Sequence, residues 1–208
     1  MCLQTNRRKG DRIMSVPLIR TALPTDIQQI SKIHKEQFGT HFLGKYSISL
    51  IEKFYLSFMQ DTVFMVSETA GVINGFVLGG MNRDLELAKQ RFLSANKRQY
   101  VAETLTTPGL YLPVIQRVSK NLTKSKEESV SPSKIPFRLL SISVSSHAKG
   151  RGVAEKLVQA FENEIASLTA YGLSVKKTNE RAIGFYHKMG FEVEVEQPDC
   201  YYFVKKLG

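Results

Sequence analysis

Apolar residues dominate residues 137–144, FRLLSISV, which we expect to form a buried strand. Pro136 stops any helix from running into this segment. Two serines follow, and Gly150 and Gly152 then open a long segment whose apolar residues have helical spacing. The pattern therefore predicts a strand, a short glycine-containing turn and a helix in direct succession.

The segment after this turn predicts two helices. The first spans about residues 150–168, and the second begins at Asn179 and ends at Gly190. The apolar positions of the first are Val153, Leu157, Phe161 and Ile165, and those of the second are Ala182, Phe185, Tyr186 and Met189. Short strands are expected at 173–175, 191–196 and 200–205, the second because apolar and acidic residues alternate along it.

The first part of the chain predicts a mixture of strands and amphipathic helices. Its predicted elements are a strand at 16–21, a helix beginning at 24–26, a loop at 38–45, a helix at 47–60 and strands at 63–67 and 72–80. Residues 84–118 predict a helical region interrupted near Pro108 and Pro113. Residues 117–136 predict a mobile surface loop.

The chain of 208 residues is expected to form a single domain over 14–208, preceded by a disordered basic tail at 1–13. We interpret 84–118 as an insertion in that domain. The net charge is +10, and the tail and the loop hold most of the excess. This charge favours anionic ligands, although a basic surface also serves solubility.

Several classes of protein are not expected from the composition. No apolar run is long enough to span a bilayer, so we expect no membrane partner. Cys2 and Cys200 lie at opposite ends of the chain and show no metal spacing. This use of cysteine favours a reducing, cytoplasmic location. The four histidines form no ligand pair, so we predict no metal site.

The strand–turn–helix predicted at 137–168 has the chemistry of a phosphate site. The first backbone N–H groups of a helix have no internal partner and lie at the positive end of its dipole. Gly150 and Gly152 allow the backbone to approach a phosphate closely, and Lys149 and Arg151 add positive charge. We therefore predict an anion-binding turn at 149–154.

This turn resembles the acetyl-CoA loop of the GNAT superfamily of N-acetyltransferases, whose pattern is Gln/Arg-x-x-Gly-x-Gly/Ala. The sequence reads KGRGVA at 149–154, so Lys149 stands where the family pattern has glutamine or arginine. Lysine keeps the positive charge of arginine but lacks its planar guanidinium group. A second family pattern, Asn-x-x-Ala-x-x-Phe-Tyr-x-x-x-Gly-Phe, follows in the right order. It is matched at Asn179, Ala182, Phe185, Tyr186, Gly190 and Phe191.

The resemblance implies an α/β (α+β) fold with a mixed, mostly antiparallel central sheet flanked by helices, whose fourth and fifth strands splay apart to hold CoA. It implies that Tyr186 protonates the departing sulfur. The implied CoA-contacting residues are Ile142, Ser143, Val144, Lys149, Gly150, Arg151, Gly152, Val153, Ala154 and Asn179. The general base is left open among Glu68, Glu103, His41 and a chain of water molecules.

The resemblance further implies acetyl-CoA as cosubstrate and transfer of its acetyl group to a primary amine of a small molecule. The loop at 38–45, the aromatic helix after it and the insertion suggest an amino sugar. The alternatives are acetylation of a protein N-terminus or lysine, and a non-enzymatic CoA-sensing or nucleic-acid-binding module. No recognition signature supports nucleic acid as a partner, and a homodimer is left open.

Overall fold

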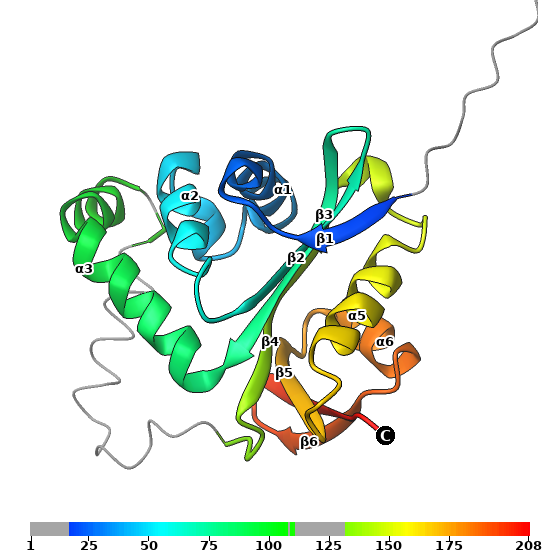
Figure 1. Ribbon diagram of the computed structural model, residues 1–208. Helices are drawn as coiled ribbons and strands as arrows, with labels where there is room; N and C mark the ends of the chain where they lie inside the picture. Colours follow the sequence, from blue (N-terminus) through cyan, green and yellow to red (C-terminus); the bar gives the residue numbers. More distant parts are fainter. Residues whose placement is uncertain (1–16, 108, 111–131) are drawn as a thin grey trace, which may run out of the picture.

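A single seven-stranded sheet organises the protein in the computed structural model, which describes residues 17–107, 109–110 and 132–208. The strands are β1 (Leu18–Thr21), β2 (Val63–Thr69), β3 (Val72–Met81), β4 (Phe137–Val144), β5 (Ala170–Lys176), β6 (Glu192–Glu196) and β7 (Cys200–Lys206). Their order in the sheet is β1-β2-β3-β4-β5-β7-β6. Every neighbouring pair is antiparallel except β4 and β5, which are parallel (Figure 1).

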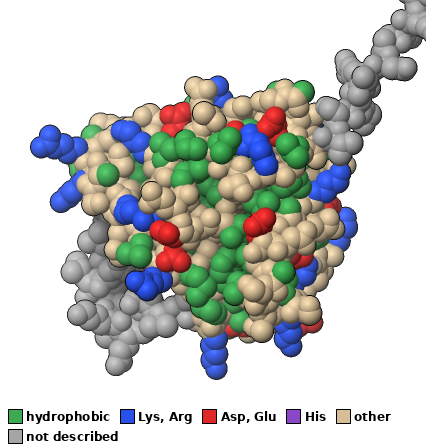
Figure 2. Space-filling model, viewed as in Figure 1, with side chains coloured by type: hydrophobic (Ala, Val, Ile, Leu, Met, Phe, Trp, Pro, Cys, Tyr) green, Lys and Arg blue, Asp and Glu red, His purple; other side chains and the backbone are tan. Residues whose placement is uncertain are grey.

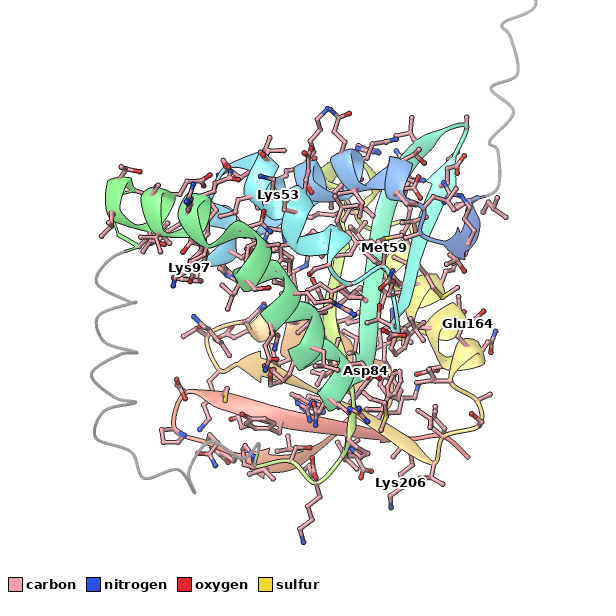
Figure 3. The ribbon with its side chains drawn as sticks, turned by 60° about the vertical axis from the view of Figure 1, so that its left-hand side comes forward. Lys53, Met59, Asp84, Lys97, Glu164 and Lys206 are labelled. Carbon is pink, nitrogen blue, oxygen red and sulfur yellow. The ribbon has the colours of Figure 1, made fainter. Side chains whose placement is uncertain are left out.

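Helices cover both faces of the sheet. One face carries α1 (Ile27–Phe38), α2 (Ile48–Leu56) and α3 (Asn82–Thr106), and the other carries α5 (Val153–Glu164) and α6 (Glu180–Lys188). In Figure 3, α3 starts near the strands at Asp84 and runs past α2, with Lys97 in its second half. Apolar side chains gather over the middle of the face seen in Figure 2, with basic side chains mainly around its edge.

Strand alternation divides the buried side chains into two cores. In β3, Phe76 and Leu78 pack with α1, α2 and α3, whereas Val77 between them packs with α5. The second core also holds Leu157, Phe161 and Phe203, so α5 is fixed to the middle of the sheet by large apolar side chains. Both faces of the sheet are therefore covered by helices that pack on apolar side chains.

The structure confirms the predicted mixed sheet and corrects some boundaries. The predicted helix at 47–60 ends at Leu56, and the helix predicted from Gly150 begins at Val153 because the glycine turn occupies the residues before it. The helical region predicted at 84–118 contains α3, which has non-helical backbone angles at Asn96. The tail at 1–13 and residues 111–131 lie outside the described residues, so the predictions made for them stand as predictions.

The last residues of the predicted loop, 132–136, are held against β6. The carboxylate of Glu194 accepts hydrogen bonds from the Ser133 hydroxyl at 2.5 Å and from the Lys134 backbone N–H at 3.0 Å. Ser133 is buried as a result. This contact fixes the approach of the chain to β4. No described helix has the length and apolar character needed to cross a bilayer.

Candidate active site

The turn between β4 and α5 has the geometry expected of an anion-binding loop. Gly150 and Gly152 have φ angles of 75° and 71°, and Gly152 is the N-cap of α5. A Cβ atom at either glycine would meet no heavy atom within 4 Å. Glycine is therefore required here by its left-handed backbone and not by close packing. The first amides of α5 point out of the helix into the space at this turn.

Contacts from β3 and α1 fix this turn in place. The Ser145 backbone N–H donates to the carbonyl of Asn74 at 2.8 Å, and His147 Nε2 lies 3.3 Å from Asn74 Oδ1. The Ser146 backbone N–H donates to the carboxylate of Glu36 at 3.2 Å, and the Ser146 contacts lower the pKa of Glu36. The exposed His147 thus serves to position the turn.

The charged side chains around the turn are mostly exposed. Lys149 and Arg151 project from it without an ion-pair partner among the described residues. Glu155, in the first turn of α5, lies 3.2 Å from Lys188 Nζ. A hydrogen bond from its own backbone N–H, together with Lys188, lowers the pKa of Glu155. Lys149, whose charge also acts on Glu36, and Arg151 give the turn a positive edge suited to an anion.

Strands β4 and β5 separate beyond a single pairing, between Arg138 and Gly172. On the other side, β4 stays paired with β3 as far as Val144. A bulge at Leu140 bends β4 directly after the point where β5 departs, because Leu78 pairs with Ser141 while Gly79 pairs with Leu139. The splayed fourth and fifth strands predicted from the sequence are confirmed.

The backbone groups that border this gap follow from the β3–β4 register. The Ser145 N–H points to β3, and strand alternation then directs the groups of Ser143 to β3 and those of Ile142 and Val144 to the gap. No described strand pairs with Ile142 or Val144 on that side. Their amide and carbonyl groups are therefore free to bind an extended ligand as an added strand would.

Tyr186 is buried in α6, with 7% of its surface exposed. Its ring packs edge-on against Phe191 at 5.4 Å between centroids, and it shares the α5-side core, against which Ile142 and Val144 pack. Burial raises the pKa of Tyr186 to about 12. Its hydroxyl has no hydrogen-bond partner among the described residues, so it remains a proton donor without a fixed acceptor.

Asn179, predicted to contact CoA, caps α6. Its Oδ1 accepts a hydrogen bond from the Ala182 backbone N–H at 3.2 Å. This bond uses the acceptor end of the amide and leaves its NH₂ group without a partner in the described part of the chain. Asn179 thus has a structural function as the cap of α6, and the predicted contact with CoA would be a second function.

The open candidates for a general base lie in different surroundings. Glu68 is paired with Arg20 at 2.7 Å at the end of β2. Glu103 accepts hydrogen bonds from the Ser47 backbone N–H and hydroxyl at the start of α2. His41 is exposed and lies against Phe38. Both carboxylates therefore have structural partners away from β4.

A polar pocket of about 230 Å³ lies at the junction of β4 and β5, and sequence reasoning did not identify it. It is lined by Asn82, Leu85, Glu86 and Lys89 of α3, Arg138, Leu139 and Leu140 of β4, Ser174 of β5 and Tyr202 of β7. We call it the α3–β4 pocket. Arg138 was the available signal, since an arginine inside an otherwise buried strand requires a polar environment. The described residues contain no group of three or more side chains suited to hold a metal.

Comparison with known proteins agrees with this geometry. The family model described as an acetyltransferase (GNAT) domain matches residues 124–193, about a third of the chain. No curated protein matches the sequence. Among solved structures, an N-acetyltransferase from Staphylococcus aureus Mu50 has 17% identity and a TM-score of 0.61, with 90% of this chain and 100% of that chain covered.

Two archaeal structures are also similar. Ard1 from Thermoplasma volcanium has 19% identity and a TM-score of 0.57, over 92% of this chain and 98% of that one. The PaiA N-acetyltransferase from Thermoplasma acidophilum, solved in complex with coenzyme A, has 14% identity and a TM-score of 0.54, over 92% and 99%. The resemblance to the GNAT superfamily is confirmed: the chain has the GNAT fold and matches the GNAT acetyltransferase domain across its glycine turn.

Proposed function

We propose that the protein is an acetyl-CoA-dependent N-acetyltransferase that acetylates a primary amine of a small molecule. The observation that carries the proposal is the gap between β4 and β5, where the groups of Ile142 and Val144 lack a strand partner, next to the left-handed glycine turn. An extended chain ending in a pyrophosphate matches both features. The neighbouring structure solved with coenzyme A supports CoA as the ligand.

Backbone groups of the site would hold the acetyl donor, acetyl-CoA. The amides of 150–154 bind the pyrophosphate, with Lys149 and Arg151 adding charge. Ile142 and Val144 bind the pantetheine arm, and an amide at the bulge polarises the thioester oxygen. Ser143 directs its backbone at β3 and would contribute less than its two neighbours. Asn179 would donate from its free NH₂ group.

Tyr186 would supply the proton for the leaving group. The amine nitrogen attacks the carbonyl carbon, the C–N bond forms and the C–S bond breaks. The sulfur leaves as a thiolate and takes the hydroxyl proton of Tyr186. The acceptor ammonium must lose one proton to the solvent or to a base before it attacks, and the nitrogen must lose a second proton to the solvent or to a base as the amide forms. The resulting tyrosinate is reprotonated from solvent, because burial keeps its pKa high, at about 12.

The α3–β4 pocket favours a small acceptor over a protein. It lies where β4 and β5 meet, and the first half of α3 forms one of its walls. A space of about 230 Å³ accommodates a small molecule, whereas a polypeptide substrate requires an open groove across the sheet. An amino sugar fits such a pocket in size, and protein acetylation remains the alternative.

Two measurements test the proposal. Calorimetric titration of CoA should show one site per chain, and thiol release from acetyl-CoA should rise with a panel of amines, amino sugars or polyamines. Release with peptides alone would favour the protein acetyltransferase. CoA binding without thiol release from any amine would favour a CoA sensor, and absence of CoA binding would exclude both functions.

A further inference from the structure

Arg138 is a buried cation in the wall of the α3–β4 pocket. Only 8% of the residue is exposed, although it lies in a strand next to the splayed edge of the sheet. Its Nη1 donates to the Ser133 hydroxyl at 2.8 Å, and its guanidinium carbon lies 5.3 Å from the centre of the Tyr202 ring. Both contacts orient the guanidinium, but neither neutralises it.

No carboxylate forms an ion pair with Arg138 within the described residues. The charge of Glu194 acts on Arg138, but its oxygens accept hydrogen bonds from Ser133 and Lys134. Burial is the largest influence on the guanidinium and lowers the pKa of Arg138. A guanidinium has five N–H donors, of which one has a described partner here. Buried arginines are normally paired, and the described residues supply no carboxylate in contact with this one.

The chain leaves space for the guanidinium at a specific position. A Cβ atom on Gly172 would lie 2.8 Å from Arg138 Nη1 and 2.9 Å from the Phe203 carbonyl oxygen. Glycine at this position of β5 therefore makes room for the arginine where the two strands meet. Ser174 and Tyr202 line the same pocket and add two hydroxyl groups beside it. The pocket thus combines the Arg138 cation with two hydroxyl groups, and the one carboxylate in its lining, Glu86, is paired with Lys89 at 2.6 Å.

We propose that Arg138 determines acceptor specificity by binding an anionic oxyacid group, a carboxylate or a phosphate, carried by the acceptor amine. The proposal rests on the proposed function and defines its substrate class. The acceptor would lie in the α3–β4 pocket with its anionic group on Arg138 and its amine toward the bulge at Leu140. A planar guanidinium binds two oxygens of such a group in parallel, which an ammonium cannot do.

Matched acceptor pairs test the specificity in the wild-type protein. An amino acid is compared with its carboxamide, and an amino sugar with its 6-phosphate, each by thiol release from acetyl-CoA. The anionic member of at least one pair should show a kcat/KM about tenfold or more above the neutral member. The pair that shows the preference identifies carboxylate or phosphate as the group. Equal values in both pairs, in a protein that turns these amines over, would overturn the proposal.

Variants assign the preference to Arg138. Arg138→Gln should reduce the ratio within the preferred pair to near one, mainly through KM, with CoA affinity unchanged. Arg138→Lys should restore part of the preference, because the charge remains without the fork. Arg98→Gln, an exposed position on α3, should leave the ratio as in the wild type. A ratio that survives in a folded Arg138→Gln protein would contradict the assignment.

A binding measurement keeps this inference separate from the catalytic proposal. Inorganic phosphate and acetate are titrated into the full chain while the Arg138 Nε–H resonance is followed by NMR, with Arg138→Gln used for its assignment. A saturable shift with either ion supports the anion site even if no amine is turned over. The absence of any shift would overturn the site, whether or not CoA binds. If Arg138→Gln fails to fold, Arg138→Lys serves for the assignment, and the wild-type acceptor pairs still test the specificity.

Discussion

Arg138 of β4 and Gly172 of β5 form the one backbone pairing that joins these strands in the described part of the chain, and the guanidinium of the first occupies the space left by the second. The two halves of the sheet therefore meet at a point where packing and a buried charge depend on each other. The strands diverge from this point toward the glycine turn. A substitution at Gly172 should accordingly disturb the packing of both halves of the sheet.

Gly172→Ala should destabilise the protein by about 1–3 kcal/mol, because the added methyl group would overlap Arg138 and the Phe203 carbonyl. Urea unfolding measures the loss. Gly184→Ala is the matched control, since this glycine lies inside α6 and a methyl group added there would meet no atom within 4 Å. It should stabilise the protein by about 0.5–1 kcal/mol. Equal effects at the two glycines would contradict this account of the junction.

Gly152→Glu should abolish CoA binding. The carboxylate would stand where the pyrophosphate is proposed to bind, and the φ angle of 71° would be strained with any side chain. Gly71→Glu is the control, because Gly71 has a φ angle of 79° and open surroundings in the β2–β3 turn. It should carry a similar strain and leave CoA affinity intact. Calorimetric titration that gives the two variants the same CoA affinity would remove the turn from the site.

The strand–turn–helix of the site could be predicted from sequence because its signals are local. Pro136 and the two serines after Val144 delimit β4, and Gly150 and Gly152 fix the turn. The environment of Arg138 could not be predicted in this way. Its partners come from β5, from β7 and from Ser133, and only the folded sheet brings them together. An arginine in a buried strand indicates that polar partners are needed, but the sequence does not show which residues they are.

The same distinction applies on the other face of the sheet. The amphipathic spacing of α1 and α2 was visible in the sequence, but the contact between His34 and Tyr55 joins two separate helices. The non-helical angles at Asn96 had only a weak signal, because neither proline nor glycine stands there and the Asn96 side chain, which donates to the Phe92 carbonyl, is merely a poor helix former. Long-range polar contacts and helix irregularities of this kind depend on packing, which periodicity does not encode.

His34 should make stability depend on pH between about 6.5 and 4. Its Nδ1 lies 2.7 Å from the Tyr55 hydroxyl and its Nε2 is buried without a partner among the described residues. Burial, with help from His41 and Lys35, lowers the pKa of His34 to about 4. The unfolded chain therefore binds a proton at higher pH than the folded one. Stability is full above pH ~6.5 and falls as the pH drops, by up to about 3 kcal/mol.

His34→Gln provides the comparison for this pH effect. Glutamine does not titrate, so the variant should lose this part of the pH dependence even if its stability at pH 7.5 is lower. Urea unfolding at several pH values, with both proteins measured side by side, gives the difference. The lowered pKa values of Asp26 and Glu103 act mainly below pH 4.5, the ordinary pKa of a glutamate, and are common to both proteins. Parallel curves for the two proteins between pH 6.5 and 4.5 would show that His34 is not responsible.

Tyr186→Phe should lower kcat by roughly 10²-fold or more, the loss expected when a general acid is removed. The ring would still pack against Phe191, and the hydroxyl has no hydrogen-bond partner among the described residues, so stability should change little. CoA affinity should also hold, because the hydroxyl acts once charge develops on sulfur. A fall shared equally by kcat and kcat/KM is the mark of an interaction made only in the transition state.

Tyr171→Phe is the matched control for Tyr186. Its ring is buried in the same core, but its hydroxyl donates to Glu162 at 2.6 Å. Removing that hydroxyl should cost about 1–3 kcal/mol of stability and leave kcat near the wild-type value, the reverse of the pattern at Tyr186. Single-turnover measurement of acetyl transfer is the decisive readout, since product release can mask a slower chemical step. An unchanged single-turnover rate in Tyr186→Phe would assign the proton to water, and the Tyr186 side chain would then serve packing alone.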